Sequence, residues 1–262
     1  MRREQTYYVI GAVLVVALLY FGFDTKPTTQ KTLEKSRVLN TPELDIHTLQ
    51  TGARKELKAE QLEYLETLES QAEFAKEDSV KTGLLKQLSG FWFQLRKPLL
   101  AGYYARQVAE KEQTATSWSI AGTSFAAALT TTGIEENDKV IARDQAVAAF
   151  ENAISLEPGV IEHRINQALC YIEAPEVAQP MKGVQMLAAL AEKYPDSALP
   201  SYHLARLALR TGQIERAEQR ILQAITLDST NARIACLAKD IYTAAGKPEN
   251  ANKWTGLCAT LN

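Results

Sequence analysis

The most suggestive chemical feature of this sequence is a set of polar residues at helical spacing. The set comprises Tyr202, His203, Arg206 and Arg210, with Asn166 and Arg233 as candidate additions from the neighbouring predicted helices. Side chains three or four positions apart share one face of a helix. Arginine binds carboxylates through charge-assisted hydrogen bonds, so the set predicts a groove that takes an acidic or C-terminal segment of a partner protein. The alternative is an ordinary charged surface balanced by acids such as Asp240.

No catalytic or cofactor-binding motif accompanies these residues. The sequence contains no G-x-S-x-G, no P-loop and no G-x-G-x-x-G after a strand. Metal-ligand spacing is also missing among the histidines, which are His47, His163 and His203. Four glutamates about one turn apart follow the solvent face of a predicted helix: Glu60, Glu63, Glu66 and Glu69. We therefore expect a protein that is not an enzyme and that needs no cofactor or metal.

The three cysteines, Cys170, Cys236 and Cys258, are an odd number without close pairing. This pattern is not a disulfide framework, and it favours small buried residues in a helical core. A Cys236–Cys258 bridge is the alternative if the domain faces an oxidising compartment.

Composition limits the class of partner. The net charge is −2 and the sequence pI is about 6.0. A nucleic-acid-binding protein usually shows a strong basic excess, so no nucleic-acid partner is expected. Hydrophobic residues make up 46% of the 262 residues, enough for a sizeable core.

One apolar run near the N-terminus predicts a membrane anchor. Tyr7–Phe23 contains no charged residue and has the length that a bilayer core requires of a helix. Arg2 and Arg3 precede the run, so the positive-inside bias leaves residues 1–6 in the cytoplasm and places the rest outside, in a bacterium in the periplasm. A cleaved signal peptide is the rival, but no small-x-small site follows the run.

A polar stretch over 24–40 predicts a flexible linker, followed by an amphipathic helical segment over 41–78. Thr41 and Pro42 resemble a helix start, and Gly52 is a candidate interruption. A stripe of Leu57, Leu65, Leu68, Ala72 and Ala75 follows. The stripe is short for a dimerising coiled coil, so packing on the first repeat is favoured.

The remaining chain is periodic. The clearest unit runs from Ala198 to Asn231 and is thirty-four residues long. Gly212 falls at its predicted turn, and Ala217, Ile221 and Ala224 give its second helix a small-large-small packing face.

Upstream residues match the same spacing. The pattern is Trp118-x2-Ala121-Gly122-x2-Phe125, then Ala146-x3-Phe150-x2-Ala153-x4-Pro158. This spacing resembles the tetratricopeptide repeat (TPR) family, whose unit is a helix-turn-helix of that length. Between the two halves, residues 130–144 predict an exposed acidic loop or an extension of the second helix.

The resemblance covers residues 79–262 and implies an all-α fold, a TPR-like solenoid of helical hairpins, behind the single transmembrane helix. The predicted units are a degenerate one over 79–114 and others at about 115–160, 161–197, 198–231 and 232–262.

The TPR resemblance also implies a function: a membrane-tethered scaffold or adaptor whose groove binds a peptide segment or a partner helix, in envelope protein assembly or translocation. Ser119 and Thr123 replace the lysine and asparagine that a carboxylate clamp would need, so that clamp is not expected. The alternative is a structural protein that forms a homo-oligomer and has no peptide ligand.

Overall fold

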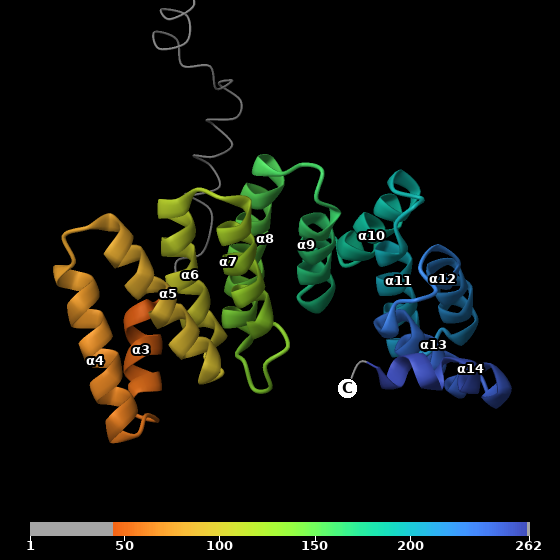
Figure 1. The fold of residues 1–262 in the computed structure, drawn as a ribbon, viewed down its shortest axis with the longest axis horizontal. Helices are drawn as coiled ribbons and strands as arrows, with labels where there is room; N and C mark the ends of the chain where they lie inside the picture. The colour runs from red at the N-terminus through yellow and green to blue at the C-terminus, as the bar shows by residue number, and fades with distance from the viewer. Residues whose placement is uncertain (1–43, 261–262) are drawn as a thin grey trace, which may run out of the picture. The chain divides into compact units, whose positions relative to one another are not determined.

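A computed structural model describes residues 44–260, and every regular element in that range is an α-helix (Figure 1). The twelve helices in the described range are α3 (Ile46–Arg54), α4 (Ala59–Phe74), α5 (Asp78–Gln94), α6 (Pro98–Glu112), α7 (Ala115–Ala128), α8 (Glu136–Leu156), α9 (Ile161–Glu173), α10 (Lys182–Lys193), α11 (Ala198–Arg210), α12 (Ile214–Leu227), α13 (Ala232–Ala244) and α14 (Pro248–Ala259). The prediction of an all-α fold is confirmed for these residues.

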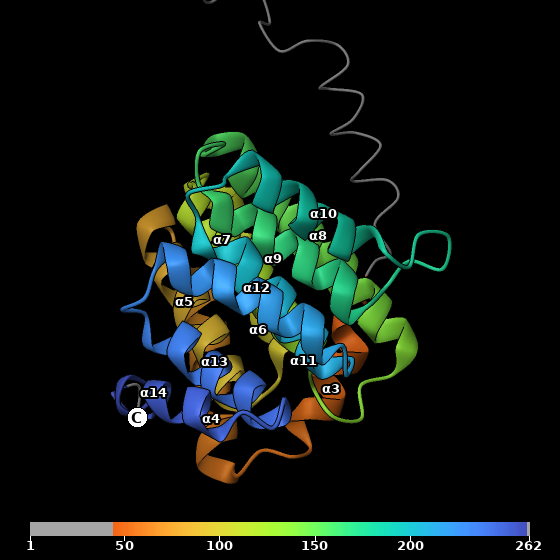
Figure 2. The ribbon, with the colours of Figure 1, turned by 90° about the vertical axis from the view of Figure 1, so that its right-hand side faces the viewer.

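From α4 onward, each helix packs on the next one along the chain, as Figures 1 and 2 show. Helices two apart also make contact, α7 with α9 and α11 with α13. Since one helical hairpin cannot shield its own apolar face, the hairpins bury one another's faces in succession. This is the TPR-like arrangement that the sequence predicts.

Close contacts at two glycines explain the repeat signature. A Cβ atom on Gly122 of α7 would lie 2.8 Å from the Phe150 ring of α8. A Cβ atom on Gly183 of α10 would meet the backbone oxygen of Ala168 and lie 2.7 Å from Ile172 Cγ1 on α9. The two helices of a hairpin can therefore approach this closely only where one of them has no side chain.

Helices α11 and α12 form a hairpin within residues 198–231. Gly212 ends α11 with a φ of +71°, a conformation that glycine adopts without steric cost. The backbone N–H of Gln213 then donates to Ala208 O at 2.9 Å, which satisfies a carbonyl at the helix end. The packing residues Ala217, Ile221 and Ala224 are fully buried.

One feature of the segment before the repeats differs from the prediction. Gly52 lies inside α3 and does not interrupt it. Helix α3 begins at Ile46, where the Asp45 side chain accepts a hydrogen bond from the Thr48 N–H. Asp45 is therefore the N-cap of α3, and its carboxylate satisfies an N–H of the first turn.

The apolar stripe of α4 packs within the chain. Leu65, Leu68 and Ala72 are buried in one cluster with Leu88 and Trp92 of α5. Since α5 already covers these side chains, the structure favours packing on the first repeat over a coiled-coil seam.

The long connection in the second unit is mostly helical. Helix α8 begins at Glu136, so residues 136–144 extend the helix and only 130–135 form a loop. The extension has a structural role, since buried Arg143 donates to Asp144 Oδ1 at 2.8 Å and to Ala174 O at 3.2 Å. Arg143 thereby fastens the loop between α9 and α10.

The cysteine prediction was wrong for two residues. Cys236 of α13 and Cys258 of α14 form a disulfide, with Cα atoms 4.6 Å apart. Their separation of 22 residues does not reveal this in the sequence, because a hairpin turn brings them together. Cys170 is a buried free thiol, as predicted.

The predicted N-terminal segments, including the anchor Tyr7–Phe23, the linker over 24–40 and the helix start at Thr41, lie outside the described residues. Among the helices of 44–260, none has the length and apolar content to cross a bilayer.

Candidate functional site: two partner-binding surfaces

The structure brings four of the predicted groove residues together on α11. Tyr202 and His203 pack edge to face, with ring centroids 5.0 Å apart. Arg206 and Arg210 are exposed. These four residues, with Asn166 and Arg233, are called the α11 patch below.

The α11 patch is less basic than the sequence suggests. Burial, together with the charge of Arg206, lowers the pKa of His203 to about 4, so its imidazole is neutral at pH 7. Arg210 Nη1 lies 2.6 Å from Glu173 Oε1 at the end of α9. The sequence suggested Asp240 as the balancing acid. Glu173 could not be predicted, because it lies on α9 and comes near Arg210 of α11 only in the folded chain. Arg206 is therefore the exposed charge on α11 itself that has no acidic partner in the described chain.

The other two residues of the α11 patch lie on different helices. Asn166 is half-buried on α9, and Arg233 is exposed at the start of α13, where its backbone N–H donates to Asn231 Oδ1 at 3.0 Å. Within residues 44–260, no hydrogen bond or ion pair joins either side chain to the four residues on α11. Their membership of a common site remains a prediction.

A second surface is an apolar groove between α5 and α7, which we call the α5–α7 groove. Its volume is about 730 Å³, and residues of α6 and α9 complete the lining. The lining residues used below are Lys86, Ser89, Gly90, Phe93, Glu112, Thr116, Ile120, Thr123, Ser124 and His163.

Uncharged side chains dominate the α5–α7 groove. None of the 14 residues of α7 carries a charge. Ile120 on α7 is 55% exposed and Phe93 on α5 is 50% exposed. Large side chains of this kind gathered in a hollow, and not scattered singly, are typical of a binding surface.

Several polar groups in the lining have partners within the chain. The hydroxyl of Ser89 donates to Ala101 O at 2.9 Å, and that of Ser124 donates to Ile120 O at 2.8 Å. Lys86 Nζ lies 2.5 Å from Glu112 Oε1. The hydroxyls of Thr116, Ser119 and Thr123 make no hydrogen bond within residues 44–260, so they are available to a bound molecule.

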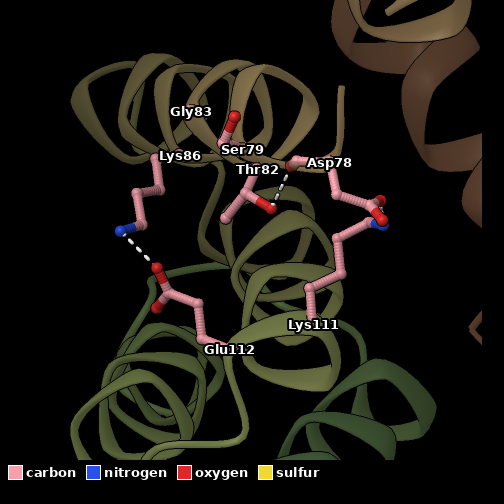
Figure 3. Close-up of a pocket in the computed structure, with 7 residues that line it drawn as sticks. All are labelled: Asp78, Ser79, Thr82, Gly83, Lys86, Lys111 and Glu112. Atoms are coloured by element: carbon pink, nitrogen blue, oxygen red, sulfur yellow. Dashed lines mark hydrogen bonds and ion pairs between the residues drawn. The ribbon is translucent and has the colours of Figure 1, made fainter. Parts of the chain in front are cut away.

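A polar pocket of about 530 Å³ adjoins the α5–α7 groove and shares Lys86 and Glu112 with it (Figure 3). Its other charged groups are Lys111 and Asp78, whose Nζ and Oδ1 atoms lie 2.6 Å apart. The hydrogen bond from Lys111 lowers the pKa of Asp78. Since the cations and anions of this pocket neutralise one another, it forms a polar rim to the groove and leaves no charge for an ionic ligand.

His163 is the buried polar residue of this lining that makes no side-chain hydrogen bond in the described chain. Its side chain is 8% exposed, yet neither ring nitrogen makes a hydrogen bond. The nearest acid is Glu157, with Oε2 at 4.0 Å from Nε2, which is beyond hydrogen-bond distance. A buried polar group without a partner is uncommon and costs free energy, so His163 is the residue of this groove that lacks a structural explanation.

The reactive groups of the described chain show no catalytic arrangement. Burial raises the pKa of the Cys170 thiol to about 12, so it stays protonated and unreactive at neutral pH. Within 44–260, no three His, Cys, Asp or Glu side chains lie close enough together to bind a metal ion.

Comparison with known proteins identifies no family. No protein-family model matches the sequence, and no curated protein matches it significantly. Among solved structures, MamA (residue 41 to the end) from Desulfovibrio magneticus RS-1 is similar with a TM-score of 0.41 and 16% identity, covering 71% of this chain and 96% of that one. MamA from AMB-1 gives 0.37 and 15%, covering 70% and 93%. PilW, a widely conserved type IV pilus biogenesis factor, gives 0.36 and 14%, covering 66% and 90%. Similarity this low does not indicate a function for this chain.

The sequence contains a signal for the α5–α7 groove that the prediction of the α11 patch did not use. Ser119 and Thr123 lie on the first helix of this unit and cannot form a carboxylate clamp. The absence of charge along the whole of α7 was the available signal. The gap between α5 and α7 could not be predicted, because it depends on how the helices are spaced in three dimensions.

Proposed function

We propose that this protein is a membrane-tethered scaffold that binds another protein through the α5–α7 groove. The carrying observation is the exposure of Phe93 and Ile120 in a hollow whose charges are paired with one another. Burial of such apolar surface favours association with a protein over association with a charged small molecule. Binding without turnover is the expected activity, since the thiol is buried and the charged groups serve the fold.

A membrane tether and an extracytoplasmic domain belong to the same proposal. The uncharged run Tyr7–Phe23 supports the tether, and Arg2 and Arg3 support its orientation. The Cys236–Cys258 disulfide also supports this orientation, because disulfides persist in oxidising compartments such as the bacterial periplasm.

A reporter enzyme fused after Asn262 tests the orientation. The proposal predicts activity of a reporter that folds only in the periplasm. Activity of a cytoplasmic reporter at the same position would contradict both the orientation and a role in envelope assembly or translocation.

The α11 patch is a second candidate site, which would take an acidic segment. Exposed Arg206 favours it, whereas Arg210 is paired with Glu173. Self-association through α4 is less favoured, because Leu65 and Leu68 are buried against α5.

Site-specific photocrosslinking in intact cells tests the scaffold function and separates the sites. A crosslinking residue replaces Ile120 in the groove, Arg206 in the patch, or Leu222, which is exposed on α12 and belongs to neither site. The proposal predicts a discrete protein adduct at Ile120 and none at Leu222. An adduct at Arg206 alone would move the site to α11, and the absence of an adduct at all three positions would reject the scaffold function.

A further inference from the structure

Helix α3 is attached to the fold differently from the helices that follow it. Its single buried residue is Ala53, whereas α4 buries three residues, α5 four and α6 eight. Ile46 and Leu49, which share the helix face of Ala53, are only partly buried in the same cluster. Burial of apolar surface is the main favourable term in packing, so α3 is held less firmly than its neighbours.

A comparison with the last helix sharpens this point. Helix α14 also buries a single residue in the described chain, Ala251, but the Cys236–Cys258 disulfide joins it to α13. Helix α3 contains no cysteine, so no covalent bond of this kind joins it to α4 or α6. Only non-covalent contacts keep α3 in place, and contacts of this kind can break and re-form.

The polar contacts of α3 form a closed circuit through three helices, which we call the α3 ring. Gln50 of α3 donates from Nε2 to the Tyr104 hydroxyl of α6 at 2.7 Å. That hydroxyl donates to Glu69 Oε1 of α4 at 3.4 Å, and Glu69 pairs in turn with Arg54 at the end of α3. The Arg54 and Glu69 side chains are 34% and 23% exposed. Water can therefore replace these contacts when the ring opens, which keeps the cost of opening low.

A hollow of about 570 Å³ lies beside α3. Residues of α3, of the start of α6 and of the loop before α8 line it, among them Leu49, Leu99 and Ile134. Close packing therefore does not extend to this side of α3. Just beyond the helix, Lys97 Nζ lies 2.7 Å from Glu56 Oε2, but the Glu56 side chain is 65% exposed, and an ion pair as exposed as this one adds little.

We propose that α3 is a reversible latch, which undocks from α4 and α6 as one unit while the later helices stay folded, and which the α3 ring closes again. Undocking frees residues 44–58, which can then extend by up to about 50 Å. Since α3 is the first described helix after the predicted anchor and linker, the latch sets how far the repeats can lie from the membrane. This consequence rests on the proposed membrane tether, whereas the latch itself does not.

Hydrogen exchange followed by mass spectrometry, on the full chain in a mild detergent, tests the latch. Amides of 46–54 should exchange at least about a hundredfold faster than the helical amides of α5–α8, because they open locally. R54M removes the ion pair that completes the α3 ring, so it should speed exchange in 46–54 about tenfold further and leave α5–α8 unchanged. E69Q should act in the same way. The double variant R54M/E69Q should act no more strongly than either single variant, because both break the same contact.

K55M is the matched control. Lys55 is exposed beside Arg54, and its side chain makes no hydrogen bond or ion pair within residues 44–260. K55M therefore removes the same charge from the same end of α3 and leaves the α3 ring intact. Exchange in 46–54 should be as in the wild type.

Three results overturn the latch. The first is exchange of 46–54 at the rate of α5–α8 in the wild type. The second is an R54M variant in which exchange rises as much in α4–α6 as in α3, and the third is a K55M variant that behaves as R54M does. The reporter fused after Asn262 decides the membrane tether separately, so a failed latch and a failed tether are distinguishable.

Discussion

The side chains of Cys236 and Cys258 join α13 to α14 through a disulfide, which ties together the last hairpin of the described chain. A cross-link of this kind restricts the unfolded state of the segment that it closes, so it should stabilise the hairpin of α13 and α14.

Reduction of this disulfide should loosen the last hairpin by about 3 kcal/mol, the value expected for a separation of 22 residues. Hydrogen exchange followed by mass spectrometry on the full chain should show faster exchange in 232–259 after reduction and little change in α5–α7. C170A should respond to reductant as the wild type does, since Cys170 is a free thiol. Equal exchange before and after reduction would show that the disulfide contributes nothing to the hairpin.

The effect of a glycine-to-alanine substitution on stability should depend on whether the new methyl group meets a neighbouring atom. G122A places a methyl group 2.8 Å from the Phe150 ring and should lower the free energy of unfolding by about 1–3 kcal/mol. G83A on α5 meets no atom within 4 Å and should raise it by about 0.5–1 kcal/mol through helix propensity. Urea unfolding followed by circular dichroism measures both. The same sign for the two variants would contradict the described packing of α7 on α8.

His203 should make stability fall as the pH falls. Its pKa is about 4 in the folded protein, against 6.5 for a solvated histidine, so the unfolded chain binds the proton first. The free energy of unfolding should therefore decrease as the pH drops from about 6.5 towards 4, by roughly 3 kcal/mol at pH 4 for this one group. H203F removes the titration, so the difference between wild type and variant should change over this pH range. If the free energy of unfolding of wild type and H203F depends on pH in the same way, His203 is more solvated than described and its pKa is not lowered by folding.

Two arginines in ion pairs should differ in their importance for stability. The Arg143 side chain is 9% exposed and anchors the loop after α9, so R143M should cost about 2–4 kcal/mol by leaving its partners unsatisfied. The Arg210 side chain is 52% exposed, so R210M should cost less than about 1 kcal/mol. Chemical denaturation of the two variants measures both values. If R210M lowers the free energy of unfolding as much as R143M does, the Arg210–Glu173 ion pair stabilises the fold more than its exposure predicts.

The periodicity of the sequence predicts the helical hairpins, but it does not predict which side chains meet on their surfaces. Ala217, Ile221 and Ala224 repeat at the spacing of one buried helix face, so their packing follows from local chemistry. The Arg210–Glu173 pair and the Cys236–Cys258 bridge join residues of different helices, and their formation depends on the stacking of those helices. The α5–α7 groove was missed for the same reason.

The central claim, that a partner docks between α5 and α7, is tested most directly by one comparison in cells. The photocrosslinking residue at position 120 is combined with G90W, which blocks the groove, or with G256W, which leaves it open. We expect the protein adduct to disappear with G90W and to persist with G256W at equal protein levels. Persistence of the same adduct in G90W would contradict docking in the α5–α7 groove.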